Sequence, residues 1–365
     1  LSEELGSLVE VYFYLGAALR SLYAALRSLN LADGLGDSPQ LARGFAIVGT
    51  IVGFASMPRL AKRYGERALD VLSRADDLAA NWWVPLVVGV SRLSTGDLST
   101  AEAHMRACAA AADRVRDRRH WCDAIENLGI AAAMRGDWGE AHRAIEQYEA
   151  VSRADEDRRY IAAALRERAY VLVQTGDAGE AARCLAELLQ ELDDGLAVER
   201  DAALQDYHAL CAVLAHARAE AQATADHLDA CLVAIEHSAA ETSFPNMHLA
   251  LVPALAVALA MGRTGSTDSA WHPSSLRWGQ ALGAAIARHA ASHRVAGPAA
   301  QLARAALAQT RGRGRAARLA YGRAFEEAQA LGLAPEAALA ARALRLPSPA
   351  ATRGLAPDLP QVAPS

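Results

Sequence analysis

The side chains that could perform chemistry in this 365-residue chain are few and scattered. His289 and His293 are four residues apart, which would place both imidazoles on one face of a helix, and such a pair can supply two ligands to a metal ion. No acidic residue or cysteine stands close to them in the sequence as a third ligand. A histidine pair at the edge of a helical core is the simpler interpretation, so we expect no metal site.

Sequence motifs of nucleotide chemistry and of hydrolysis are missing. The chain has no GxxxxGK[ST] phosphate loop, and Lys62 is its only lysine, so a phosphate-loop lysine is not available. It also has no GxGxxG, HExxH or GxSxG motif. We therefore expect neither catalytic residues nor a cofactor site in this chain.

Cysteine usage and charge narrow the possible partners. Five cysteines are spread singly and without a CxxC pair: Cys108, Cys122, Cys184, Cys211 and Cys231. An odd number of scattered cysteines in a helical chain is typical of reduced core residues. The formal net charge of −5 indicates no overall attraction to nucleic acid or anionic lipid. One basic run lacks interleaved aromatic side chains and is expected to be a solvated turn: Arg311, Arg313, Arg315, Arg318 and Arg323.

The elements that must position these residues are predicted by composition. Alanine fills about a quarter of the sequence, and 52% of all residues are hydrophobic but only 5% aromatic. Alanine is the strongest helix former and β-branched residues are sparse, which predicts an all-α fold. The longest apolar run, residues 249–261, contains Pro253 and is too short to cross a bilayer. We expect it to be a buried helix, and we expect no membrane contact.

A repeat of 40 residues organises the chain. Three Gly-Asp pairs are spaced by 40 residues, with their glycines at Gly96, Gly136 and Gly176. Five positions after each glycine stands an alanine, and the same spacing extends in both directions to give Ala61, Ala101, Ala141, Ala181 and Ala221. A second glycine series precedes the turns by seven residues: Gly49, Gly89 and Gly129. Periods of this length are typical of stacked helical hairpins.

The physical role of each position in one unit can be stated. Gly136 ends a first helix because glycine tolerates positive φ, and Asp137 caps a second helix with Glu140 three residues later. The second helix then presents Ala141 and Ile145 on one apolar stripe. A glycine inside the first helix costs about 1 kcal/mol in helix propensity. We expect close contact between the two helices to compensate.

The repeat predicts one elongated array rather than two compact domains. We expect an array over residues 1–262, an irregular loop over 263–275, and degenerate helical repeats over 276–346 that continue the array. Residues 347–365 are rich in proline and small residues and are expected to be a disordered tail. The N-terminus starts inside a helical pattern without a signal peptide. This favours a cytoplasmic protein of which the chain is a fragment.

The spacing resembles the tetratricopeptide repeat. The pattern Leu-x-x-Gly-Asp-x-x-x-Ala, with a further glycine seven residues before the turn, matches three small positions of that family. These positions are Gly89, Gly96 and Ala101 in one unit and Gly129, Gly136 and Ala141 in the next. The family's period is about 34 residues, so helices in this chain are expected to be longer. The resemblance implies a right-handed α-solenoid of helix hairpins.

A second resemblance covers residues 8–345 and concerns large bacterial signalling proteins. In these proteins an adenylate or guanylate cyclase and an AAA (STAND-type) ATPase precede helical repeats. Residues 22–32 are similar to the opening repeat of that region, and residues 312–333 are similar to its last one. The resemblance implies a larger parent protein whose nucleotide chemistry lies outside this segment.

The tetratricopeptide resemblance also implies a partner-binding groove. In that family the second, fifth, ninth and twelfth positions of the first helices point into the concave surface. In this chain the corresponding residues include Trp83, Leu86, Val90, Asp123, Glu126, Ile130, Ala163, Arg166 and Tyr170. Such a groove is apolar at one end and charged in the middle, which suits a helix or an extended peptide. Packing of the groove against the parent's own ATPase or cyclase domain remains open as an alternative.

Three functional hypotheses follow from these observations. The first is a non-catalytic interaction or sensor region of a bacterial signalling protein that binds a protein or peptide partner. The second is part of an adenylate cyclase or ATPase whose chemistry lies outside this segment. The third is the effector region of a transcription regulator, although this sequence contains no DNA-binding module.

Overall fold

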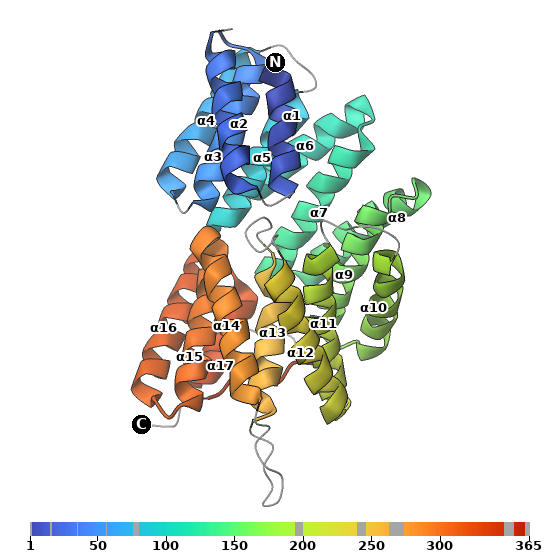
Figure 1. The fold of residues 1–365 in the computed structure, drawn as a ribbon, viewed down its shortest axis with the longest axis vertical. Coiled ribbons are helices and arrows are strands. Elements are labelled where there is room, and N and C mark those ends of the chain that lie inside the picture. Colours follow the sequence, from blue (N-terminus) through green and yellow to red (C-terminus); the bar gives the residue numbers. More distant parts are fainter. Residues whose placement is uncertain are drawn as a thin grey trace, which may run out of the picture.

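A computed structural model describes residues 2–14, 17–34, 36–55, 57–75, 80–193, 200–238, 246–262, 274–346 and 354–361. These described residues form seventeen α-helices, one short 3-10 helix and no strand (Figure 1). The predicted all-α helical repeat fold is confirmed.

The helices follow one another as short antiparallel hairpins. The N-terminal helices are α1 (Ser2–Tyr14), α2 (Ala18–Asp33), α3 (Pro39–Phe54), α4 (Pro58–Arg74), α5 (Ala80–Thr95) and α6 (Leu98–Val115). The middle helices are α7 (Arg118–Arg135), α8 (Trp138–Ala154), α9 (Arg158–Thr175), α10 (Ala178–Asp193), α11 (Arg200–Ala217) and α12 (Ala221–His237). The C-terminal helices are α13 (His248–Ala260), α14 (Ser275–Ser292), η2 (Arg294–Ala296), α15 (Gly297–Thr310), α16 (Gly314–Leu331) and α17 (Ala334–Leu344).

The predicted Gly-Asp turns have the predicted geometry. The three glycines adopt left-handed backbone conformations, with φ of 82° at Gly96, 74° at Gly136 and 93° at Gly176. The aspartate that follows each glycine accepts a hydrogen bond from the backbone N–H three residues later, as Asp137 does from Glu140 at 3.1 Å. Each side chain therefore satisfies one of the N–H groups that a helix N-terminus leaves unpaired.

The second glycine series lies where paired helices approach most closely. A Cβ added to Gly49 would lie 3.1 Å from the Cβ of Tyr64 and 3.3 Å from the backbone N of Gly65. A Cβ at Gly129 would lie 3.3 Å from the Cβ of Ala144. Four of the predicted contact alanines are buried: Ala61, Ala101, Ala141 and Ala181. The predicted close packing is confirmed at these positions.

The prediction for Ala221 is wrong. Ala221 is exposed and is the first residue of α12, instead of lying one turn inside it. The left-handed residue of this turn is Ala219, with φ of 59°, and the fully buried residue five positions later is Thr224. The turn therefore comes three residues later than the 40-residue spacing places it, and α11 ends at Ala217.

Helix α13 lies at the centre of the C-terminal part. Residues 248–259 are all buried, as expected for a helix that is apolar on every side. This confirms the prediction of a buried helix for the apolar run at 249–261. None of the helices that the structure describes is long and apolar enough to span a membrane.

The C-terminal helices curve back towards the middle of the array. Helix α17 contacts α7, and in Figure 1 α14–α17 lie beside α13 and below the N-terminal helices. The turn glycines Gly96 and Gly136 pack against Leu331 and Pro335, respectively. The first helices of successive hairpins contact one another in the order α7, α9, α11, α13, α15 and α17, and α17 then contacts α7 again.

Residues 354–361 correct the expectation for the C-terminus. We expected a disordered tail over 347–365, but this segment is held against α9, α16 and α17. Leu359 is buried, which explains why a proline-rich sequence takes a fixed position here. The rest of the expected tail, and residues 263–273 of the expected loop, lie outside the described residues.

Candidate partner-binding surfaces

The nine predicted groove residues lie on three neighbouring first helices, α5, α7 and α9. Six of them are partly exposed: Trp83, Val90, Asp123, Glu126, Ala163 and Arg166. The other three, Leu86, Ile130 and Tyr170, are buried in the protein's own core. The surface that a partner could reach is therefore narrower than the predicted groove and more strongly charged.

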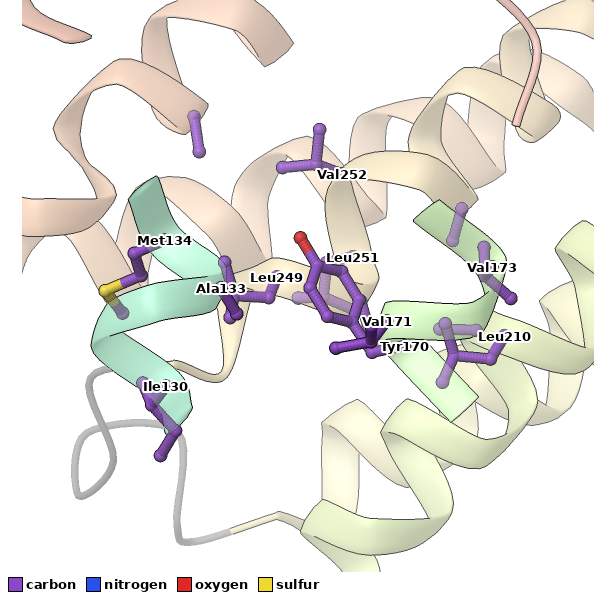
Figure 2. Packing of buried hydrophobic residues seen from close by; sticks show 14 of the residues in the cluster. Ile130, Ala133, Met134, Tyr170, Val171, Val173, Leu210, Leu249, Leu251 and Val252 are labelled. Atoms are coloured by element: carbon purple, nitrogen blue, oxygen red, sulfur yellow. The ribbon is translucent and has the colours of Figure 1, made fainter. Parts of the chain in front are cut away.

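Helix α13 accounts for the burial of two of these residues. Figure 2 shows Leu249 of α13 between Ala133 of α7 and the ring of Tyr170, from α9. The same narrow space is lined by Ile130, Tyr170 and Leu249 together. Two apolar positions of the predicted groove, Ile130 and Tyr170, are thus covered by the chain itself.

Asp123 is held in one orientation on the accessible part of this surface. Its Oδ1 accepts a hydrogen bond of 2.7 Å from the hydroxyl of Tyr160, and it lies 3.6 Å from Nη1 of Arg159. Both partners belong to the next first helix, α9, so this contact joins two repeats. Burial, followed by the charge of Asp123, raises the pKa of the Tyr160 hydroxyl well above its usual value, which keeps it a donor.

Arg166 lies between two carboxylates in the middle of the surface. Its guanidinium is 3.7 Å from Oε1 of Glu167 and 3.7 Å from Oδ2 of Asp206, and Tyr148 donates a 3.0 Å hydrogen bond to Glu167. Burial raises the pKa of Asp206 to about 6, and burial followed by the charge of Glu126 raises the pKa of Glu167. We call Asp123, Glu126, Arg166, Glu167 and Asp206 the inner charged cluster.

A second feature is a cavity of about 300 Å³ near the turn between α7 and α8, which we call the turn-side pocket. Its walls come from α8, α9, α13, α17 and the C-terminal segment. The lining side chains include Trp138, Tyr170, Gln174, Leu249, Val252, Pro253, Glu336, Leu339, Arg342, Ala356 and Leu359. Tyr170 is the one predicted groove residue that lines it.

The histidine pair is a core feature that joins separate helices. His289 and His293 are both buried, with ring centroids 4.5 Å apart. Nδ1 of His293 lies 2.8 Å from the hydroxyl of Ser94 on α5, and the ring of His248 stacks 5.4 Å from that of His289. Within the described ranges, no group of three or more His, Cys, Asp or Glu side chains is arranged to hold a metal ion.

The five cysteines are free thiols, four of them buried and Cys211 half-buried. Burial raises the pKa of Cys108 to about 12 and that of Cys122, Cys184 and Cys211 to about 11. A thiol with so high a pKa is protonated at neutral pH and is a poor nucleophile. Their arrangement agrees with the prediction of reduced core residues.

Comparison with known proteins supports the fold. No protein-family model and no curated protein matches the sequence. The chain is similar to the crystal structure of a Rap protein complexed with Competence and Sporulation Factor, with a TM-score of 0.58 and 10% identity over 94% of this chain and 96% of that chain. The similarity supports a tetratricopeptide-like helical repeat fold for this chain. A structure of Naa15/Naa10 bound to HypK-THB aligns at a TM-score of 0.24 and 14% identity, over 93% of this chain and 66% of that chain.

Sequence reasoning missed two members of the inner charged cluster of this tetratricopeptide-like array. Glu167 directly follows the predicted Arg166. Asp206 stands 40 residues after Arg166, and Arg166 stands 40 residues after Glu126. The same spacing continues from Asp206 to Asn246, which lines the space beside the cluster. The 40-residue spacing, applied to the first helices instead of the turns, would have found Asp206.

Proposed function

We propose that this chain is a non-catalytic interaction module that binds a segment of a protein partner at the inner charged cluster. The observation that carries the proposal is the fixed orientation of partly buried charges on adjacent first helices. Asp123 is held by Tyr160, and Arg166 lies between Glu167 and Asp206. Oriented charges of this kind give an interface specificity and a defined register.

The charges favour a partner segment that carries arginine or lysine. Burial raises the pKa of Glu167, and the remaining carboxylates of the cluster, those of Asp123, Glu126 and Asp206, outnumber the guanidinium groups of Arg166 and of Arg159, which lies beside Asp123. A basic side chain from a partner would offset this excess of negative charge. Arginine is well suited, because its planar guanidinium can pair with two carboxylate oxygens at once.

The wider context of the module is also part of the proposal. The resemblance to cyclase- and ATPase-linked repeat regions supports a sensor arm in a cytoplasmic bacterial signalling protein. The partner segment could then belong to the parent's own nucleotide-binding domain. A phosphate loop or cyclase domain encoded upstream of Leu1 would support this context, whereas an upstream DNA-binding module would favour a transcription regulator.

A peptide-display selection tests the partner site. We expect the chain to enrich basic peptides, and Glu126→Lys to weaken their binding at least tenfold by reversing one charge. Glu146→Lys is the matched control, because Glu146 is an exposed glutamate on the second helix α8. Peptides that bind both variants equally well would refute this site. Nucleotide binding by the chain, measured by calorimetry, would instead favour an enzyme of the cyclase or ATPase class.

A further inference from the structure

Residues 354–361 bind to the helices as an extended peptide binds to a receptor. The backbone N–H of Leu355 donates a 2.9 Å hydrogen bond to the carbonyl of Val173, at the end of α9. At the other end of the segment, the hydroxyl of Tyr321 donates a 2.8 Å hydrogen bond to the carbonyl of Pro360. These two contacts hold the backbone of the segment and do not depend on its side chains.

Gly354 fixes where the segment begins to bind. A Cβ at this position would lie 2.9 Å from the carbonyl oxygen of Val173 and 3.1 Å from the Cα of Gln174. Both are backbone atoms of α9, so they cannot move aside as a flexible side chain could. The binding surface therefore accepts only glycine at this position.

Two side chains anchor the rest of the segment. Asp358 forms an ion pair with Arg342 of α17, with 2.9 Å between Oδ1 and Nε. Leu359, next to it, is only 2% exposed. The segment thus carries a sequence pattern of glycine, aspartate and leucine that the helices recognise.

The segment does not fill the space between these anchors. Ala356 lines the turn-side pocket opposite Trp138, Tyr170 and Pro253, and about 300 Å³ remains unfilled between them. Protein interiors are normally packed with few voids larger than a water molecule. A pocket of this size, walled by aromatic and aliphatic side chains, is in the range of ligand-binding sites.

The same pocket also contains a buried carboxylate, which a ligand would have to pair with a polar or charged group. Glu336 lines it and is only 4% exposed, and Nε2 of the buried His248 lies 3.9 Å from its Oε1. Its Oε2 has no hydrogen-bond partner among the described residues. Burial raises the pKa of this carboxyl to about 7. An acceptor in such a place is costly to leave unpaired, and a donor or cation supplied by a ligand would satisfy it.

We propose that the turn-side pocket is a second binding surface, for an extended partner segment that keeps the glycine, aspartate and leucine of residues 354–361 and has arginine or lysine in place of Ala356. The aliphatic stem of that residue would lie along the apolar walls, and its cation would pair with Glu336. The chain's own C-terminal segment occupies the surface when the partner is absent, and acts as an internal competitor. This site is separate from the inner charged cluster, so the proposal does not depend on the function proposed above.

The test uses the full chain and two fluorescein-labelled synthetic peptides, one with the sequence of residues 354–361 and one with Ala356→Arg. Binding is measured by fluorescence anisotropy. In the Gly354→Ala protein the internal competitor is displaced, and we expect the Ala356→Arg peptide to bind at least tenfold more tightly than to the wild type. Gly322→Ala is the matched control, because an added Cβ there meets nothing within 4 Å, and it should bind as the wild type does.

Two further comparisons test the chemistry of the pocket. The Ala356→Arg peptide should bind the Gly354→Ala protein at least fivefold more tightly than the unchanged peptide does. Adding Glu336→Gln should abolish this advantage and leave the affinity for the unchanged peptide as it was. An advantage that survives Glu336→Gln would overturn the assignment of the basic side chain to this carboxylate.

A second variant that releases the internal segment covers the case in which Gly354→Ala displaces that segment incompletely. Leu359→Asp removes the buried anchor of the internal segment, and the far-ultraviolet circular dichroism of each variant reports whether the helices remain folded. If folded Gly354→Ala and Leu359→Asp proteins both fail to bind either peptide, the proposal is refuted. A wild-type dimer in sedimentation experiments that Gly354→Ala abolishes would assign the pocket to the segment of a second copy and would also overturn it.

Discussion

The regular hairpins from α5 to α10 and the C-terminal helices from α11 to α17 reach similar packing by different means. In the regular hairpins, glycine takes the left-handed position of the turn inside each hairpin, and Arg116 and Glu156 take it between hairpins. Aspartate caps the next helix in both kinds of turn. In the C-terminal part, Glu220, Arg313 and Leu333 occupy the cap positions of α12, α16 and α17 without a side-chain cap. Yet the C-terminal part contains α13, which is buried on every side.

This difference separates local from tertiary control of helix position. Capped turns fix the ends of a helix before it packs, whereas a helix without caps depends on the apolar surface that it buries. The regular hairpins should therefore be sensitive to changes at turns and close approaches, and the C-terminal part to changes in buried side chains. Each prediction below tests one side of this contrast.

The largest effect is expected in α13. Leu255 is fully buried at the centre of the C-terminal part, and Leu255→Ala should lower the free energy of unfolding by about 4 kcal/mol, from lost burial and the cavity left behind. The control Leu319→Ala, at a leucine that is 61% exposed on α16, should change it by less than about 0.5 kcal/mol. Chemical denaturation followed by circular dichroism measures both. Equal losses would contradict the central position of α13.

The second effect concerns Glu336, in the first turn of α17. Burial raises its pKa from 4.5 to about 7 in the folded state. The folded state therefore holds more protons than the unfolded state between these pH values, and the free energy of unfolding falls as the pH rises through this window. Glu336→Gln keeps the neutral form, so it should be about 3 kcal/mol more stable than wild type at pH 8 and equally stable at pH 4.

Denaturation at a series of pH values measures this difference. Other buried carboxylates, such as Asp206, contribute equally to wild type and variant and cancel in the comparison. Glu326→Gln, at an exposed glutamate on α16, serves as the control and should leave the pH profile unchanged. A constant difference between Glu336→Gln and wild type from pH 4 to pH 8 would show that Glu336 does not titrate in this window.

The sequence predicted the regular hairpins well because their signals are local. The turn and cap at Gly136, Asp137 and Glu140 lie within one helical turn, so spacing alone located them. The apolar run at 249–261 likewise predicted a buried helix. The same spacing failed at Ala221, where Ala219 takes the left-handed position without a glycine to mark it. A non-glycine residue in that conformation leaves no recognisable pattern.

The candidate sites were harder to predict because they depend on contacts between distant parts of the chain. Arg166 was predicted from its helix position, but its carboxylate neighbour Asp206 lies one repeat away. The burial of Tyr170 depends on α13, some 80 residues later in the chain. The docking of residues 354–361 depends on Val173 and Tyr321, which no local pattern connects to the C-terminus.

A glycine comparison distinguishes close approach from mere helix propensity. Gly49→Ala places a Cβ 3.3 Å from the backbone N of Gly65, whereas Gly322→Ala on α16 meets nothing within 4 Å. Alanine improves helix propensity by about 1 kcal/mol at both sites, but overpacking at Gly49 costs about 1–3 kcal/mol. We expect Gly322→Ala to be stabilising and Gly49→Ala to be about 2 kcal/mol less stable than Gly322→Ala, as measured by denaturation. Stabilisation by both would mean that α3 and α4 do not need a glycine at their contact.

The smallest effect compares two helix caps directly. Asp137 accepts a hydrogen bond from the backbone of Glu140, so Asp137→Ala should lower the free energy of unfolding by about 1 kcal/mol. Glu220 stands at the equivalent position of α12 without a side-chain cap, so Glu220→Ala should have almost no effect. Asp137→Asn keeps the capping oxygen and should recover most of the loss. If Glu220→Ala were as harmful as Asp137→Ala, α12 would depend on its first turn as much as α8 does, and the contrast between local and tertiary control would fail at this hairpin.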